Sequence, residues 1–371
     1  MAIPFLRKIR ALFPLKLGQP PIKLGQSPSK PGQPQNKPGS TTTVPAAEHQ
    51  SYRVQDRAAY WCFRLIVAFV QSLPLERSQR IASLIAGFLT HVAPIRGKLV
   101  RENLQRAFPA WQPEQSVATQ QQMWEHLVLM LCEVAVAPRK IHRENWYDHY
   151  HISVEDRRTM MQIALDRRPK VLVSGHFGNF ELAGYVTGLF GIGTTTIARP
   201  LDNGFVHDYI NRFRSLGGQY LLPKSGSAAD VELILQKGGA LSLLADQYGG
   251  PKGCWVEFLG HPASCHKALA LFTLSSGAPM MVCSNVRKNE PLVFETKVLG
   301  VADPQSEECP DSVADLTRWY NACLESEIRE FPGQYWWVHH RWKGVPPTKK
   351  RTAESSLSES TLPANSCAGS C

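Results

Sequence analysis

A histidine and an acidic residue stand close together at the end of an apolar run, and their side chains are of the types that move protons. Residues 171–174 form the run, Gly175 allows a tight turn, and His176 follows, with Glu181 five positions further on. On one continuous α-helix, residues five apart would lie about 140° apart around the axis. The two side chains can therefore converge only if His176 lies in the turn and Glu181 lies at the start of the next helix.

Such a pair could carry out general acid–base catalysis. A carboxylate that holds one imidazole nitrogen orients the ring and stabilises its cationic form, and the other nitrogen can then accept a proton from an attacking hydroxyl. In this arrangement His176 would accept a proton from a hydroxyl that attacks a thioester, with Glu181 as its partner. The alternative is a histidine that bonds to backbone at a strand end, with Glu181 on a solvated helix surface.

The pattern of apolar residues from about Lys170 onward is typical of an α/β fold. Short apolar runs alternate with amphipathic segments, which predicts a layered mixed sheet flanked by helices. The ligand site of such a sheet lies after the carboxyl ends of the strands, where both His176 and Asp246 fall. The sequence predicts strands over residues 171–174, 194–198, 219–222, 240–245, 279–286 and 293–299, and helices over residues 180–190, 205–216, 228–237, 267–276 and 312–330.

Two apolar stretches precede this pattern, over residues 60–73 and 81–94. Arg64 interrupts the first and Pro74 closes it, and neither stretch reaches the ~18–20 uninterrupted apolar residues of a membrane-spanning helix. We expect an N-terminal hairpin of helices that lies in the membrane interface, supported by the aromatic residues near position 60. An ordinary buried helix pair is the alternative.

The formal net charge of +10 belongs mainly to the two ends of the chain. Residues 1–53 hold eight Lys or Arg and one Glu, residues 348–371 hold three Lys or Arg and two Glu, and residues 54–347 keep only +2. The first segment repeats Lys-Leu-Gly-Gln and Lys-Pro-Gly-Gln units, which predicts a flexible basic tail suited to an anionic membrane surface and not to nucleic acid. The nine cysteines include no CxxC pair, so we expect no metal site.

Residues 175–181, Gly-His-Phe-Gly-Asn-Phe-Glu, closely resemble the HxxxxD/E box of the lysophospholipid acyltransferase superfamily, and in detail that of bacterial lipid A lauroyl/myristoyl (late) acyltransferases. The resemblance covers most of the chain, from about Tyr60 to Pro347, and an ordered set of further segments carries it. They are residues 97–109 with Asn-Leu…Phe-Pro, 197–203 with Arg-Pro, 211–217 with an arginine in a helix, 244–263 with Asp-Gln, and 332–343 with aromatic and basic residues.

The resemblance implies a glycerol-phosphate-acyltransferase-like fold and roles for individual residues. It makes His176 the base, Glu181 its orienting partner, and Arg199, Arg214 and Asp246 substrate-binding residues. An arginine can hold a phosphate, either on a saccharide lipid or on a donor's phosphopantetheine, through two parallel hydrogen bonds. For Arg214, a helix salt bridge is an equal alternative.

The last of these segments is open to two interpretations. Arg341 and Lys343 stand beside Trp336, Trp337 and Trp342. Basic and aromatic side chains together are typical of a rim at a membrane interface, where the rings lie at the level of the headgroups. The same residues could instead close the domain, with the arginine covered by the aromatic rings.

The activity that the resemblance implies is transfer of a fatty acyl group from an acyl thioester to a hydroxyl of a glycolipid, most simply a lipid A precursor. The donor would be an acyl carrier protein or acyl-CoA, with no cofactor and no serine or cysteine acyl-enzyme. The protein would lie on the cytoplasmic face of a bacterial inner membrane. We expect a basic tail over residues 1–55, membrane-associated helices over 56–112, an acyltransferase α/β domain over 113–347 and a polar tail over 348–371.

Three other functions compete with this one. Phosphatidylinositol mannoside acyltransferases share the same motifs, so another glycolipid could be the acceptor. A hydrolase would use His176 to activate water and would release free fatty acid. A non-catalytic membrane-surface adaptor would work through its basic tail, and the presence of both His176 and Glu181 argues against it.

Deletion of residues 1–53 should weaken binding to anionic membranes, because this segment carries most of the basic excess of the chain. Sedimentation with vesicles that contain anionic lipid, at low and at high salt, measures the effect. The full-length protein should lose binding as salt rises, and the shortened protein should bind more weakly with less dependence on salt. Salt-independent binding by both proteins would contradict the prediction.

Overall fold

The computed structural model describes residues 54–223 and 226–347. The predictions of a basic tail before residue 54 and of a polar tail after residue 347 concern residues outside these ranges. The division of the chain into four regions therefore stays a prediction.

A seven-stranded mixed sheet forms the centre of the fold, with the strand order β1-β9-β8-β2-β5-β3-β4. Its strands are β1 (Tyr150–His151), β2 (Lys170–Ser174), β3 (Thr194–Ala198), β4 (Gln219–Pro223), β5 (Ala240–Leu244), β8 (Met280–Arg287) and β9 (Phe294–Ala302). The strands from β8 to β4 run parallel to one another, whereas β9 is antiparallel to β8 and parallel to β1. The predicted α/β fold with a mixed sheet is confirmed.

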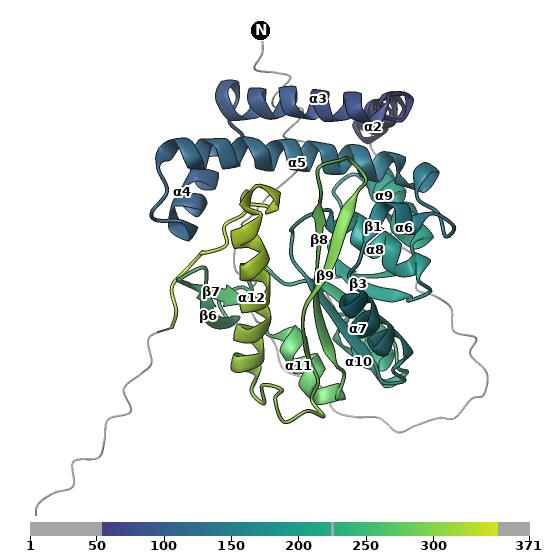
Figure 1. Cartoon of the computed structure of the whole chain (residues 1–371), viewed down its shortest axis with the longest axis vertical. Helices are drawn as coiled ribbons and strands as arrows, with labels where there is room; N and C mark the ends of the chain where they lie inside the picture. Colours follow the sequence, from purple (N-terminus) through teal and green to yellow (C-terminus); the bar gives the residue numbers. More distant parts are fainter. Residues whose placement is uncertain (1–53, 224–225, 348–371) are drawn as a thin grey trace, which may run out of the picture.

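Helices cover both faces of this sheet (Figure 1). They are α7 (Val154–Leu165), α8 (Phe180–Leu189), α9 (Gly204–Leu216), α10 (Ala228–Gln236), α11 (Ala268–Ser276) and α12 (Val313–Glu330). Side chains of β2 alternate between the two faces. Val171 and Val173 are buried in the main core, to which α11 and α12 contribute, and Leu172 and Ser174 point to the side of α7 and α8.

The longest helix, α5 (Pro113–Lys140), lies across the end of the sheet where the parallel strands finish (Figure 1). Its sequence explains its start, because Pro113 suits the first helical position and the backbone N–H of Gln112 donates to the side chain of Gln115 at 2.8 Å. Arg139 and Lys140 in its last turn complement the helix dipole. This helix is not among those predicted from the sequence.

Four shorter elements precede α5, and α3 packs on its outer side (Figure 1). They are α2 (Val54–Ser72), α3 (Leu75–Gly87), the π-helical turn η1 (Phe88–Val92) and α4 (Gly97–Ala107). Ala82 of α3 is fully buried against Leu129 and Cys132 of α5. Within the described residues, no helix has both the length and the apolar character needed to cross a membrane.

The remaining elements are α6 (Trp146–His149), which contacts β1, the hairpin strands β6 (Cys254–Phe258) and β7 (His261–Cys265), and the short 3₁₀ helix η2 (Pro332–Gln334), which contacts α5 and α12. The two hairpin strands are antiparallel, and α12 packs against β6. The segment after η2 returns to the carboxyl end of β2, where Phe177 forms a bridge with Tyr335.

Replacement of Leu316 by alanine should destabilise the fold without touching the end of the sheet that holds His176. Leu316 lies in the first turn of α12, at the opposite end of that helix from η2, and is fully buried in the main core. Loss of its side chain should lower the free energy of unfolding by about 2–5 kcal/mol, because it leaves a cavity. Chemical unfolding measures the change.

The control for this prediction is Leu233→Ala in α10, where the side chain is 48% exposed. A surface substitution of this kind should change the free energy of unfolding by about 0.5 kcal/mol or less. Equal effects of the two substitutions would contradict the assignment of Leu316 to the core.

Candidate active site

The register of two neighbouring strands brings His176 and Asp246 together. Ser174 at the end of β2 pairs with Leu244 at the end of β5, so His176 and Asp246 each lie two residues beyond the same ladder position. The Nδ1 atom of His176 lies 2.8 Å from Oδ1 of Asp246, and the backbone N–H of His176 donates to Oδ2 at 2.8 Å. One carboxylate therefore fixes both the ring and the backbone of the histidine.

Asp246 is fully buried, and its environment keeps it ionised. Burial opposes its negative charge, but attraction to the His176 ring and hydrogen bonds from His176 outweigh burial and hold the pKa of Asp246 well below its usual range. A carboxylate can only accept hydrogen bonds, so Nδ1 of His176 carries the proton in this pair. The other ring nitrogen, Nε2, is then an acceptor, and the amide nitrogen of Gln247 lies 3.2 Å from it.

The expectation that Glu181 holds the imidazole of His176 is wrong for this structure, because Asp246 takes that place. Glu181 lies in the first turn of α8, as expected, but its carboxylate accepts two hydrogen bonds from the guanidinium of Arg214 in α9, at 2.7 and 3.1 Å. Attraction to Glu181 raises the pKa of Arg214, although burial opposes it. The salt bridge considered for Arg214 is therefore present, and it joins two helices.

Two other arginines differ from each other in exposure. The side chain of Arg199 is 67% exposed and its nearest carboxylate, that of Asp202, lies 3.8 Å away. Arg341, by contrast, is buried, and its guanidinium donates to the backbone oxygen of Ser264 at 3.0 Å and lies over the ring of Phe258. Of the two interpretations of the last segment, the interfacial rim is wrong for Arg341, which closes the domain core.

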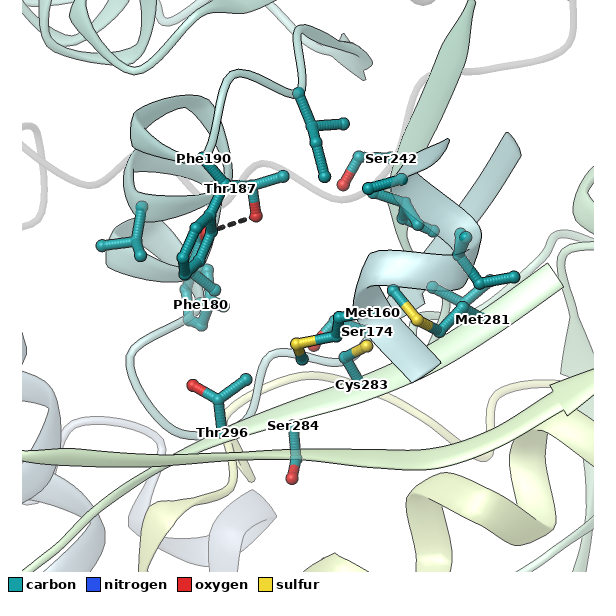
Figure 2. A pocket seen from close by; sticks show the side chains of 18 of the residues that line it. Met160, Ser174, Phe180, Thr187, Phe190, Ser242, Met281, Cys283, Ser284 and Thr296 are labelled. Carbon is teal, nitrogen blue, oxygen red and sulfur yellow. Dashed lines mark hydrogen bonds between the residues drawn. The ribbon is translucent and has the colours of Figure 1, made fainter. Parts of the chain in front are cut away.

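An apolar cavity of about 240 Å³ begins beside the histidine, between the sheet and helices α7 and α8. Figure 2 shows side chains of both layers that border it, among them Phe180 of α8 and Phe190 directly after it, Met160 of α7, and Met281 and Cys283 of β8.

The cavity and the histidine are connected through aromatic rings. Phe180 borders the cavity, and its ring centroid lies 5.0 Å from that of His176. The ring of Trp336 stands perpendicular to the imidazole at 5.5 Å, and the backbone N–H of Trp336 donates to the carbonyl of His176 at 3.0 Å. Glu181 and Arg214 border the same cavity. The arrangement places an imidazole whose Nε2 contacts the amide of Gln247 next to an apolar cavity that Glu181 and Arg214 also border.

The site contains a layer of residues that the sequence analysis did not single out. His126 and Glu133 of α5 and Arg287 of β8 lie buried behind the turn that carries His176. No group of three or more His, Cys, Asp or Glu side chains in the described part of the chain is arranged to hold a metal ion.

Comparison with known proteins identifies the family. The family model for bacterial lipid A biosynthesis acyltransferases matches residues 46–344, so the chain belongs to this family. It is therefore an acyltransferase of lipid A biosynthesis, and it acts on an acyl donor and a lipid acceptor. The family is membrane-associated. The resemblance on which the sequence analysis relied is thus confirmed.

Two curated relatives come from Escherichia coli K12. The lipid A biosynthesis palmitoleoyltransferase is 27% identical over 284 residues, which cover 75% of this chain and 86% of that protein. The lipid A biosynthesis lauroyltransferase is 24% identical over 298 residues, which cover 77% of this chain and 93% of that protein. Among solved structures, the 1-acyl-sn-glycerophosphate acyltransferase of Thermotoga maritima matches 71% of this chain and 100% of that chain, with a TM-score of 0.34 and 14% identity.

Acid should destabilise the protein through His339, which is half-buried near Asp246. Burial lowers the pKa of His339 to about 4, and attraction to Asp246 offsets this only in part. Between about pH 6.5 and pH 4 the unfolded chain therefore binds a proton at this imidazole that the folded protein does not bind. The free energy of unfolding should fall by about 2–3 kcal/mol from this residue as the pH drops from about 7.5 to about 4.5.

Urea unfolding at the two pH values measures this change in wild type and in His339→Gln. The variant lacks the titrating group, so its free energy of unfolding should depend less on pH in this range. An equal change in the free energy of unfolding between the two pH values in both proteins would show that His339 does not contribute to the pH dependence.

Proposed function

We propose that the protein transfers a fatty acyl group from an acyl thioester to a hydroxyl of a lipid A precursor, with His176 as general base and Asp246 as its orienting partner. The observation that carries this proposal is the short contact between Nδ1 of His176 and the buried carboxylate of Asp246. It leaves Nε2 as a proton acceptor at the edge of the sheet. A carboxylate in this position also stabilises the imidazolium that forms when the ring takes a proton.

The reaction needs no covalent intermediate on the enzyme. Nε2 of His176 accepts the proton of the acceptor hydroxyl while the hydroxyl oxygen forms a bond to the thioester carbonyl carbon. When the resulting tetrahedral adduct breaks its carbon–sulfur bond, the thiolate leaves and takes the proton back from the imidazolium. The amide of Gln247 occupies the position next to Nε2 in this structure, so the acceptor hydroxyl has to replace it there.

The cavity beside Phe180 suits the acyl chain of the donor. It lies between the sheet and two helices, and most of the side chains that border it are apolar. An acyl chain that ends beside Phe180 would place its thioester carbonyl near His176, because Phe180 borders the cavity and its ring centroid lies 5.0 Å from that of His176. The two curated relatives are named for different acyl groups, so the length of the transferred chain is not part of this proposal.

The ion pair between Glu181 and Arg214 supports a role in binding and not in proton transfer. Both side chains border the cavity, and each is about 21% exposed. Arg214 can offer its remaining N–H groups to a phosphate or carbonyl oxygen of a substrate while Glu181 holds it in place. Arg199 is 67% exposed and is not among the residues that border the cavity, so the role proposed for it is a contact with a substrate headgroup outside the cavity.

Membrane association is proposed to use the outer surface of α2, α3 and η1. Large apolar side chains are exposed there at helical spacing, and a soluble surface rarely gathers so many. They are Trp61, Leu65, Ile66 and Phe69 on α2 and Leu84, Phe88 and Val92 on α3 and η1. We infer that these helices lie in the headgroup region on the cytoplasmic face of the inner membrane, where the acyl carrier protein or acyl-CoA donor is present.

Replacement of His176 by alanine should abolish acyl transfer and leave membrane association intact, because the ring supplies the base and no part of the outer helices. Asp246→Asn should lower the rate by about 10³–10⁴-fold, because the amide cannot hold the ring in the same tautomer. Purified protein with acyl carrier protein thioester and a lipid A precursor, followed by mass spectrometry of the lipid, measures both. A substantial rate for His176→Ala would remove the base assignment.

Glu181→Gln is the matched control for Asp246→Asn, because each change replaces a carboxylate by the amide of the same size. The proposal expects a clearly smaller loss for Glu181→Gln, with an effect on substrate binding. The reverse order of the two losses would make Glu181 the partner of His176 during catalysis. Free fatty acid as the sole product, with acceptor present, would favour a hydrolase.

A phosphatidylinositol mannoside in place of the lipid A precursor tests the other glycolipid acceptor. If wild type transfers to neither lipid and does not differ from His176→Ala, a non-catalytic adaptor becomes the better account.

A further inference from the structure

A buried ion pair lies directly behind the turn that carries His176. The guanidinium of Arg287, at the end of β8, donates from Nε and Nη2 to the two carboxylate oxygens of Glu133 in α5, at 2.7 and 2.6 Å. The Glu133 side chain is 0% exposed and that of Arg287 is 7% exposed. A buried pair of charges is seldom more stable than well-packed apolar residues, so stability alone does not explain its presence.

The carboxylate of Glu133 also holds the chain on both sides of the ion pair. It accepts a hydrogen bond from the side-chain amide of Asn179 at 2.8 Å and one from the backbone N–H of Leu292 at 2.9 Å. Asn179 caps α8, because its side-chain oxygen accepts from the backbone N–H of Leu182 at 3.1 Å. Glu133 thereby fixes the residue that ends the His176 turn and starts the following helix.

His126 is the second contact between α5 and this turn. It stands seven residues before Glu133, so both side chains lie on the same face of the helix. Nε2 of His126 lies 3.1 Å from the carbonyl oxygen of Gly178, and Nδ1 lies 2.5 Å from Nη1 of Arg287. A carbonyl only accepts and a guanidinium only donates, so Nε2 carries the proton and the ring is neutral. Burial and then the charge of Arg287 lower the pKa of His126, which agrees with a neutral ring.

The backbone of the turn has no freedom to shift at Gly178. Its N–H donates to the carbonyl of Gln334 at 3.0 Å, and the side chain of Gln334 forms two hydrogen bonds with the backbone of Arg287, at 2.8 and 2.9 Å. Gly178 has a φ of +58°, and a Cβ there would lie 1.9 Å from the carbonyl oxygen of Asn285. Only glycine fits so close to the neighbouring strand.

The last residue of the turn is held by Asn285 of β8. The backbone N–H of Asn179 donates to the carbonyl of Asn285 at 3.1 Å, and the side-chain amide of Asn285 donates to the carbonyl of Asn179 at 3.0 Å. With the contacts of His176 to Asp246 and Trp336, the backbone polar groups of His176, Gly178 and Asn179 all have partners.

We propose that His126, Glu133 and Arg287 are positioning residues that hold the His176 turn in the geometry needed for proton transfer. The inference rests on the proposed role of His176 as base. None of the three borders the apolar cavity beside Phe180; they act through the carbonyl of Gly178 and the side chain of Asn179. A displacement of a catalytic group by about 1 Å can cost about 100-fold in rate, so a rigid support behind the turn has a direct kinetic value.

The main test compares two neutral replacements of His126. In His126→Gln, the side chain can still donate to the carbonyl of Gly178 and accept from Arg287, whereas in His126→Leu it can do neither. The His126→Leu variant should lose about 100-fold in kcat with little change in KM, and His126→Gln should recover most of that loss. Steady-state transfer assays with varied thioester donor and fixed lipid acceptor measure both constants.

Leu316→Ala serves as the control for lost stability, because its cavity lies at the far end of α12. At a temperature where all proteins are folded by circular dichroism, this variant should keep the kcat of wild type. If His126→Leu also keeps that kcat, while His176→Ala is inactive, the three residues do not position the turn. The proposal would also be overturned if the two variants had similar free energies of unfolding and kcat fell no more in His126→Leu than in Leu316→Ala.

A double variant covers the case in which His126→Leu does not fold. Glu133→Leu together with Arg287→Met removes both buried charges at once, so no unpaired charge remains. This protein should fold and still lose kcat by about 10–100-fold, because Asn179 has lost its acceptor. Full activity of the folded double variant would refute the proposal. If His176→Ala itself proves active, the base assignment fails and this inference fails with it.

Discussion

The proposed chemistry of this protein depends on one carboxylate that is shared between the side chain and the backbone of a histidine. Asp246 and His176 belong to segments 70 residues apart, and only the parallel pairing of β2 and β5 brings them side by side. Both carboxylate oxygens are used by His176, which offsets the cost of burying the charge. Rotation of the ring would break this contact, so the contact fixes the orientation of the second ring nitrogen, Nε2.

Buried charged groups also hold the opposite side of the turn that carries His176. A helix interior and a strand end supply charged groups that reach backbone atoms and a capping side chain, and none of them reaches the cavity. Buried polar groups of this kind have a high cost when one partner is missing and a fixed geometry when all are present. The geometry of the site therefore depends both on the strands that are followed by His176 and Asp246 and on helix α5, which carries neither residue.

The sequence predicted the sheet well from β2 onward, because strand and helix periods alternate there and glycines mark several ends. β3 was placed over its observed residues, and α8 and α12 were placed within one residue at each end. The partner of His176 was assigned by closeness in sequence, whereas pairing across the sheet decides it. Periodicity cannot show which strands are neighbours, so Asp246 was expected in the site but not on the imidazole.

The long helix α5 was missed, although it held a usable signal. His126 and Glu133 stand seven residues apart within a largely apolar stretch, which places two polar groups on one buried face. Such groups must find partners inside the protein. The sequence does not contain the identity of those partners, because Arg287 and Gly178 reach them only through the folded sheet.

One consequence follows from the place of α5 between two layers. Its outer side carries α3, and its inner side touches the turn that holds His176 through His126. An α-helix with its side chains is about 10–12 Å thick. In the proposed arrangement, with α2 and α3 at the lipid surface, His176 would lie about one helix thickness below the headgroups, and a glycolipid would present its hydroxyl without leaving the bilayer.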